Sequence, residues 1–139
     1  MPVTFQILRD RGTVYVRYDG QARIAETIEA FAAYTTDPDC RPGQRQLVDL
    51  SGLTGVETDY LSLMQMQAIK ADHFGREGQQ TLIAYFAPSR KGQDLALAVL
   101  RSWDGVDRVA ARMFEDEAAA LAFLGLPERR IADLLETAG

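Results

Sequence analysis

Hydroxyl and carboxylate side chains are concentrated in the segment "LVDLSGLTGVETDY", residues 47–60. Serine, threonine and aspartate can serve in nucleophilic catalysis, accept phosphate or cap a helix. The sequence supports these three roles to different degrees. The side chains of this candidate region are Asp49, Ser51, Glu57, Thr58, Asp59 and Tyr60.

Catalysis by Ser51 would require a general base, and His73 is the only histidine in the chain. No G-x-S-x-G motif connects the two residues. Catalytic triads assemble from distant positions, so spacing alone leaves a hydrolase that uses Ser51 and His73 as the less favoured alternative. We expect a non-enzymatic protein, in which His73 lies near the end of a helix and favours the helix dipole when charged.

Helix capping and turn formation account for the same cluster without chemistry. Thr58 at an N-cap would accept a backbone hydrogen bond, and Asp59 in the first turn would favour the helix dipole, together worth ~1–2 kcal/mol. Ser51 and Gly52 fit a turn after a strand. We expect Asp49 to accept hydrogen bonds from backbone N–H groups of that turn.

A second candidate site is "APSRKGQDL", residues 87–95, between an apolar strand and a helix. Loops that leave the carboxyl ends of strands line the usual ligand crevice of α/β sheets, and a helix N-terminus with nearby cations favours an anion. Ser89, Arg90 and Lys91 could therefore bind a phosphate or a lipid headgroup. The loop lacks the glycine density of a phosphate-binding loop, and exposed capping residues explain it equally well.

Metal and cofactor chemistry has little support in the sequence. Cys40 is the only cysteine, which leaves one histidine, one cysteine and scattered carboxylates as ligands. We expect neither a metal nor a cofactor.

Expected strands and helices alternate along the chain and must position these residues. "VTFQIL" and "TVYVRY" flank "RDRG" and predict a β-hairpin, and a helix follows over residues 22–35. The elements expected after that helix are the strand "RQLVDL", the helix "TDYLSLMQMQAIKADHF" closed by Gly75, the strand "TLIAYFA", the helix "GQDLALAVLRSW", the strand "DRVAARMF", the helix "EDEAAALAFLG" and a short helix from Pro127. This order predicts an α/β fold, in which a mixed, mainly parallel sheet is packed by helices.

Length and composition predict one globular domain over residues 1–139. The chain is 47% hydrophobic and 25% charged, and it has no apolar run of the ~20 residues that a transmembrane helix needs. Its N-terminus lacks the pattern of a secretory signal, so we expect a cytoplasmic protein. A net charge of -5 argues against binding to nucleic acid.

The hairpin, the strand that carries "DLSG" at residues 49–52 and the helix that follows resemble the STAS domain, specifically the SpoIIAA-like group of anti-sigma-factor antagonist relatives. The C-terminal "MFEDEAAALAFLGL" is similar to the last strand and helix of that group. The resemblance covers nearly the whole chain in element order. It implies a regulatory domain that acts by associating with a protein partner.

The resemblance also implies a phosphorylation switch, from which this sequence departs. Members of the family accept phosphate on Ser or Thr at the start of this helix, in a motif resembling Asp-Ser-Ser-Gly. Counting from Asp49 aligns residues 57–60 with that motif, so that Asp59 takes the acceptor position and Tyr60 the glycine position. A permanent carboxylate carries less charge than phosphate, and we expect the switch to be lost. A register shifted by one residue would place Thr58 at the acceptor position.

Two of the expected helices are apolar on more than one face, which bears on assembly. A single sheet covers one side of a helix, so Leu97, Leu100 and Trp103 are predicted to face a second copy in a homo-oligomer, unless a neighbouring helix covers them. The excess of apolar side chains on these helices also fits a small amphipathic or anionic lipid-like ligand held between helices and sheet. The sequence therefore predicts a non-catalytic regulatory or binding domain, with ligand binding as the alternative to protein association.

Overall fold

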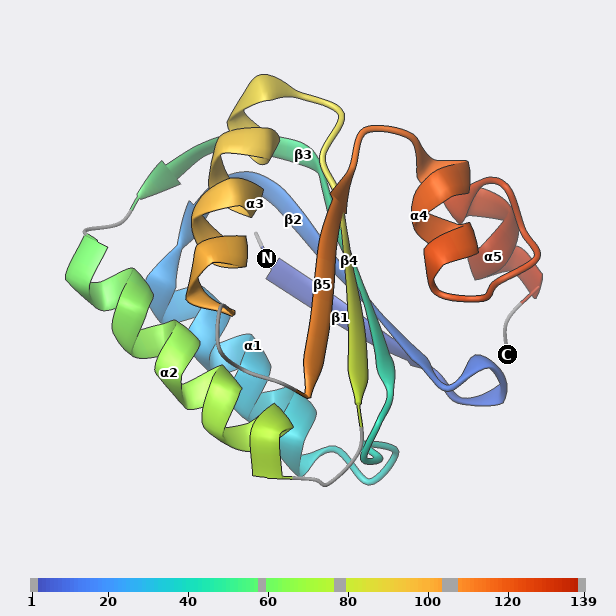
Figure 1. The fold of residues 1–139 in the computed structure, drawn as a ribbon, viewed down its shortest axis with the longest axis horizontal. Coiled ribbons are helices and arrows are strands. Elements are labelled where there is room, and N and C mark those ends of the chain that lie inside the picture. The colour runs from blue at the N-terminus through green and yellow to red at the C-terminus, as the bar shows by residue number, and fades with distance from the viewer. Residues whose placement is uncertain (1–2, 58–59, 77–79, 104–107, 138–139) are drawn as a thin grey trace.

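Five strands form one mixed sheet within residues 3–57, 60–76, 80–103 and 108–137, which the computed structural model describes (Figure 1). In sheet order they are β1 (Val3–Leu8), β2 (Thr13–Arg23), β3 (Arg45–Glu57), β4 (Thr81–Phe86) and β5 (Val109–Phe114). The helices are the 3-10 helix η1 (Arg9–Arg11) and the α-helices α1 (Ile24–Thr36), α2 (Tyr60–Arg76), α3 (Arg90–Ser102), α4 (Glu117–Phe123) and α5 (Ile131–Thr137). The predicted α/β fold with an N-terminal hairpin and a mainly parallel sheet is confirmed.

The order of the strands decides which face each helix covers. β1 and β2 are antiparallel and joined through η1 and Gly12, whose positive φ of 55° favours glycine. The later strands are added in parallel, one beside the next. Because crossovers between parallel strands are right-handed, adding strands in one direction places α1, α2 and α3 on the same face. Figure 1 shows this helix layer on one side of the sheet, with α4 and α5 on the other.

Each face of the sheet has its own hydrophobic core. Side chains alternate along a strand, so Val14 and Tyr15, or Ile83 and Ala84, enter opposite cores. The first core, under α1–α3, contains Val14, Tyr18, Leu50, Met66, Ile83, Tyr85, Ala96, Val99 and Trp103. The second core, under α4 and α5, contains Leu8, Tyr15, Leu47, Ala84, Phe86, Leu121, Leu124, Ile131 and Leu134.

Strand β3 is longer than predicted, and the expected turn at Ser51 and Gly52 is wrong. Pairing with β4 ends at Asp49, opposite Phe86, but pairing with β2 continues to Glu57. The pairing of β2 with β3 is irregular here: Asp49 lies opposite Arg17, but Gly52 lies opposite Asp19. Between these two pairs β3 therefore has one residue more than β2. Such a bulge accommodates an extra residue without ending the strand, which is why a turn-like dipeptide lies inside β3. We call the paired segments Asp19–Arg23 and Gly52–Glu57 the β2–β3 extension.

Several helix boundaries also differ from prediction, because residues expected at a helix end belong to a strand, to an N-cap or to the helix itself. α1 begins at Ile24, since β2 continues to Arg23. α3 begins at Arg90, after Ser89 at the N-cap, and Gly75 lies within α2 rather than after it. The last helix begins at Ile131 and not at Pro127.

Helix α3 is covered more completely than predicted. Trp103 is only 6% exposed and donates Nε1–H to the hydroxyl oxygen of Tyr85 at 3.0 Å, so its assignment to an outward face is wrong. Leu100 packs partly against the first core, whereas Leu97 is 46% exposed. The physical reason is that α3 contacts α2 as well as β3 and β5, which covers more than one side of the helix.

Two arginines, one in the hairpin connection and one at the start of β3, connect the sheet to the C-terminal helical segment. Arg11 donates to both carboxylate oxygens of Glu128 at 2.6 and 2.8 Å, and Arg45 donates to the carbonyl of Leu124 at 2.5 Å. Within the described ranges, no helix combines the length and the apolar character that crossing a membrane would require.

Candidate functional site

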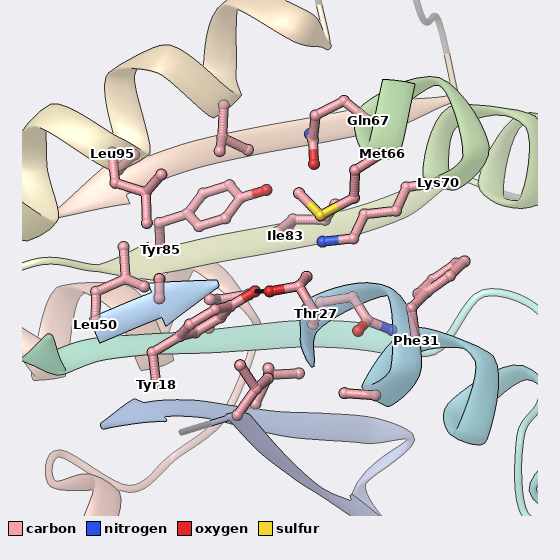
Figure 2. Close-up of a pocket in the computed structure, with 18 of the residues that line it drawn as sticks. Tyr18, Thr27, Phe31, Leu50, Met66, Gln67, Lys70, Ile83, Tyr85 and Leu95 are labelled. Carbon is pink, nitrogen blue, oxygen red and sulfur yellow. Dashed lines mark hydrogen bonds between the residues drawn. The ribbon is translucent and has the colours of Figure 1, made fainter. Parts of the chain in front are cut away.

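A cavity of about 90 Å³ lies in the first core, between the sheet and helices α1, α2 and α3 (Figure 2). A water molecule occupies about 30 Å³ in the liquid, so this space is large enough for several waters or a short apolar chain. The β2–β3 extension contributes Ala22, Arg23 and Val56 to the lining. Its other apolar lining residues include Val14, Val16, Ile24, Leu50, Met66, Ile83, Leu95 and Val99.

Helical periodicity explains which side chains reach the cavity. On α1, Thr27, Phe31 and Tyr34 recur at spacings of four and three residues and turn toward the sheet. On α2, Met66 and Lys70 are one turn apart and face the same space. The small residues Ala22, Ala30 and Ala96 also line it. A larger residue at any of these three positions would take up part of the empty volume.

Lys70 places a cation inside this apolar surrounding. Figure 2 shows its side chain extending from α2 with the ammonium directed into the cavity. Nζ lies 5.9 Å from the centre of the Phe31 ring, within the range of a cation–π contact. Burial lowers the pKa of Lys70 to about 8. Among the side chains that the structure describes, no carboxylate forms a salt bridge with Lys70. Lys70 is partly buried, and a partly desolvated cation without a counter-ion is costly, so an anion in the cavity would relieve that cost.

Tyr85 provides a hydrogen-bond donor on the opposite wall. Its oxygen accepts the Trp103 Nε1–H bond, and no acceptor for its own hydroxyl hydrogen is found in the described part of the chain. Burial raises the pKa of Tyr85 well above its ordinary value, so the hydroxyl stays protonated and able to donate.

Tyr18 and Thr27 form a polar chain that is already complete. Thr27 Oγ1 donates to the carbonyl of Arg23 at 3.2 Å and lies 3.3 Å from the hydroxyl of Tyr18. Since each hydroxyl has one hydrogen, Tyr18 is then the donor to Thr27. Neither hydroxyl has a hydrogen left for a ligand.

Asp49 belongs to a separate polar network, on the face of the sheet that α4 and α5 cover. Its Oδ1 accepts the backbone N–H of Ser51 at 2.9 Å and the Ser51 hydroxyl at 2.6 Å. Its Oδ2 accepts the Tyr15 hydroxyl at 2.5 Å and Arg17 Nη1 at 3.2 Å. The prediction that Asp49 accepts a backbone N–H bond is therefore confirmed. Burial and the Asp49 bond raise the pKa of Tyr15 to about 12.

Ser51 and His73 are not brought together on one face of the sheet. Ser51 donates its hydroxyl to Asp49 on the face of α4 and α5, whereas His73 belongs to α2 in the opposite layer. The His73 side chain lies outside the described residues. The arrangement provides no support for the Ser51–His73 alternative.

The degenerate phosphorylation motif falls largely outside the described part of the chain. Thr58 and Asp59 are not described, and neither are the side chains of Glu57 and Tyr60. Glu57 ends β3 and Tyr60 begins α2. The loss of the phosphorylation switch stays a prediction.

The residues of the predicted anion site lie together at the N-terminus of α3, but two of them already have protein partners. Ser89 is the N-cap, and its Oγ accepts the backbone N–H of Gly92 at 3.3 Å. Lys91 Nζ donates to the carbonyl of Thr54 at 2.6 Å and so ties α3 to the β2–β3 extension. Arg90 is exposed. Capping and anchoring account for Ser89 and Lys91, and anion binding there stays a prediction. No cluster of three potential metal ligands occurs among the described histidine, cysteine, aspartate and glutamate residues.

Neither Lys70 nor Tyr85 was selected from the sequence. Lys70 carried a signal, because Leu63, Met66, Lys70 and Phe74 recur at helical spacing and place one lysine in an apolar stripe. Tyr85 carried none, since an aromatic residue in an apolar strand is ordinary core.

Comparison of the sequence with protein-family models and with curated proteins returns no match.

Proposed function

We propose that this protein is a non-catalytic binding domain that holds a small amphipathic molecule in the cavity between the sheet and helices α1–α3. The observation that carries the proposal is the Lys70 ammonium inside an apolar cavity without a carboxylate partner among the described residues. An amphipathic ligand would bury its apolar part against the lining and bring its polar part to the cation.

The composition of the lining supports this proposal. Small-molecule sites are mostly apolar, with a few polar groups that fix the orientation of the ligand. Apolar burial stabilises a complex by roughly 25 cal/mol per Å², less the entropy cost of association. Lys70 and Tyr85 are among its few polar groups, beside the amides of Gln46 and Gln67, and the aliphatic and aromatic neighbours supply the apolar area.

The test is to fill the cavity and measure binding of a small probe. Ala30 lines the cavity, whereas Ala33 is exposed on the same helix. In isothermal titration with 1-hexanol, Ala30→Leu should lose at least tenfold in affinity, and Ala33→Leu should bind as the unmodified protein does. Native mass spectrometry of freshly purified protein should also detect a retained small molecule. Equal binding by both variants, or failure of the unmodified protein to bind either alcohols or carboxylates of two to ten carbons, would contradict the proposal.

Protein association, as the STAS resemblance implies, is the second candidate. It is favoured by the exposed apolar side chains Met64 and Ile69 on α2 and Leu97 on α3, of which Ile69 is 53% exposed. In this function the protein would act without the usual phosphorylation switch. Substantial phosphorylation of Thr58, found by phosphopeptide mapping in the native host, would contradict that part.

A further inference from the structure

The polar groups that face the cavity indicate the chemical class of its ligand. Lys70 approaches from α2 and Tyr85 from β4, and Figure 2 shows the two polar ends directed into the same space. One is a cation and the other a neutral donor whose hydrogen has no acceptor among the described residues. The remaining hydroxyls of the lining belong to Tyr18, Thr27 and Tyr34. Those of Tyr18 and Thr27 are occupied by each other and by the Arg23 carbonyl, and that of Tyr34 donates to Gln44 Oε1 at 2.8 Å.

We propose that the cavity accepts a short aliphatic carboxylate, with one oxygen facing the Lys70 ammonium and the other the Tyr85 hydroxyl. This inference rests on the proposed function and adds to it the headgroup and the residues that select it. A carboxylate has two acceptor oxygens and one negative charge, which match one donor and one cation.

Charge argues for a carboxylate over a phosphate. A phosphate monoester carries about 1.5 to 2 negative charges at neutral pH and offers three acceptor oxygens. The other cation of the lining, Arg23, is exposed on the β2–β3 extension. A dianion beside Lys70 would keep part of its charge uncompensated in an apolar surrounding.

Volume limits the length of the chain. The cavity of about 90 Å³ has room for several waters, which suits an aliphatic chain of a few carbons. Longer chains would have to extend past the rim formed by Arg23 and Val56.

Trp103 takes on a positioning role in this arrangement. Its Nε1–H bond to the Tyr85 oxygen at 3.0 Å fixes the phenol and leaves the Tyr85 hydrogen free to point into the cavity. The same bond strengthens Tyr85 as a donor, because hydrogen bonds in a chain polarise one another.

The experiment compares hexanoate with its neutral analogue 1-hexanol and with hexyl phosphate, by isothermal titration at pH 7. The unmodified protein should bind hexanoate at least tenfold more tightly than either of the others. Lys70→Met should remove the preference for hexanoate while keeping 1-hexanol binding, and Tyr85→Phe should weaken hexanoate binding severalfold. Arg101→Met, which removes an exposed cation of α3 outside the cavity lining, should bind all three compounds as the unmodified protein does.

A measurement on the unmodified protein covers the case in which a variant does not fold. The chain has two lysines, so lysine labelled with ¹³C and ¹⁵N gives separate NMR signals for Lys70 and Lys91. Saturating hexanoate should raise the titration midpoint of Lys70 and leave that of Lys91 unchanged. An unchanged Lys70 midpoint, a preference that survives Lys70→Met, or tighter binding of 1-hexanol or hexyl phosphate would overturn the carboxylate assignment and leave the proposed function standing. Failure of acids and alcohols of two to ten carbons to bind would overturn both.

Discussion

Asp49 and Ser51 lie on the same side of β3 and are joined twice, because one carboxylate oxygen of Asp49 accepts both the backbone N–H and the hydroxyl of Ser51. This contact lies at the bulge where β3 parts from β4 and continues beside β2 alone. The second carboxylate oxygen holds Tyr15 and Arg17 of β2. These hydrogen bonds give Asp49 and Ser51 a structural role, which is to stabilise β3 at the bulge.

Asp49→Asn should lower the free energy of unfolding by about 2–3 kcal/mol, because Asp49 is 2% exposed and the amide replaces an acceptor by a donor among four donors. Ser51→Ala removes one hydroxyl near the surface and should cost about 1 kcal/mol or less. Urea denaturation of the two variants measures both values. A larger loss for Ser51→Ala than for Asp49→Asn would contradict the structural role of Asp49.

Gly52→Ala should destabilise the protein by about 2 kcal/mol or more, through steric strain. A Cβ atom at Gly52 would lie 2.9 Å from the carbonyl oxygen of Tyr18, which belongs to the backbone and cannot turn away. Gly55 on the same strand is the matched control, since a Cβ there would have its nearest neighbour, Gln21 Cγ, at 4.0 Å. Thermal denaturation should show a clear drop for Gly52→Ala and little change for Gly55→Ala. Equal midpoints for the two variants would refute the close approach.

Lys70 should make stability depend on pH. Its pKa is about 8 in the folded protein and 10.5 ordinarily, so between these values the unfolded chain keeps a proton that the folded protein has released. The free energy of unfolding should therefore rise as pH increases through this window. Lys70→Met should remove the rise and be more stable at pH 7, by at most about 3 kcal/mol.

The measurement is urea unfolding at pH 7.0, 8.0 and 9.0. The other titratable side chains that line the cavity are Tyr18, Arg23, Tyr34 and Tyr85. Readings stop near pH 9 to avoid the ionisation of tyrosine. Tyrosines of the unfolded chain ionise near pH 10, whereas the pKa of Tyr15 in the folded protein is about 12. Between these values the folded protein binds more protons, so the free energy of unfolding falls as pH rises. A flat curve for the unmodified protein would show that the Lys70 ammonium is solvated.

Leu97 should form part of a homo-oligomer contact. It is the residue of the predicted set Leu97, Leu100 and Trp103 that the fold leaves 46% exposed. Light scattering at micromolar concentration should show an oligomer that Leu97→Glu dissociates, because a buried glutamate would be desolvated in the interface. Leu100→Glu is a weaker test, since Leu100 packs partly against the first core. A monodisperse monomer for the unmodified protein would end this prediction.

The order of strands and helices was available from the sequence, because the hydrophobic period changes from two to about 3.6 wherever the backbone changes from strand to helix. "VTFQIL" and "TVYVRY" were recognisable as a hairpin, and "TLIAYFA" as a buried strand, for this local reason. The bond from Asp49 to the Ser51 backbone was likewise predictable, since its two partners are two residues apart.

Tertiary structure alone decided what depends on residues distant in sequence. The bulge that keeps Ser51 and Gly52 inside β3 exists because β2 pairs alongside, and Trp103 is buried because α3 lies against both the sheet and α2. Lys70 and Tyr85 face one cavity because right-handed crossovers place α1, α2 and α3 on the same face of the sheet. Side-chain periodicity reports which face of an element is apolar, but only the packing of elements determines which polar groups meet inside.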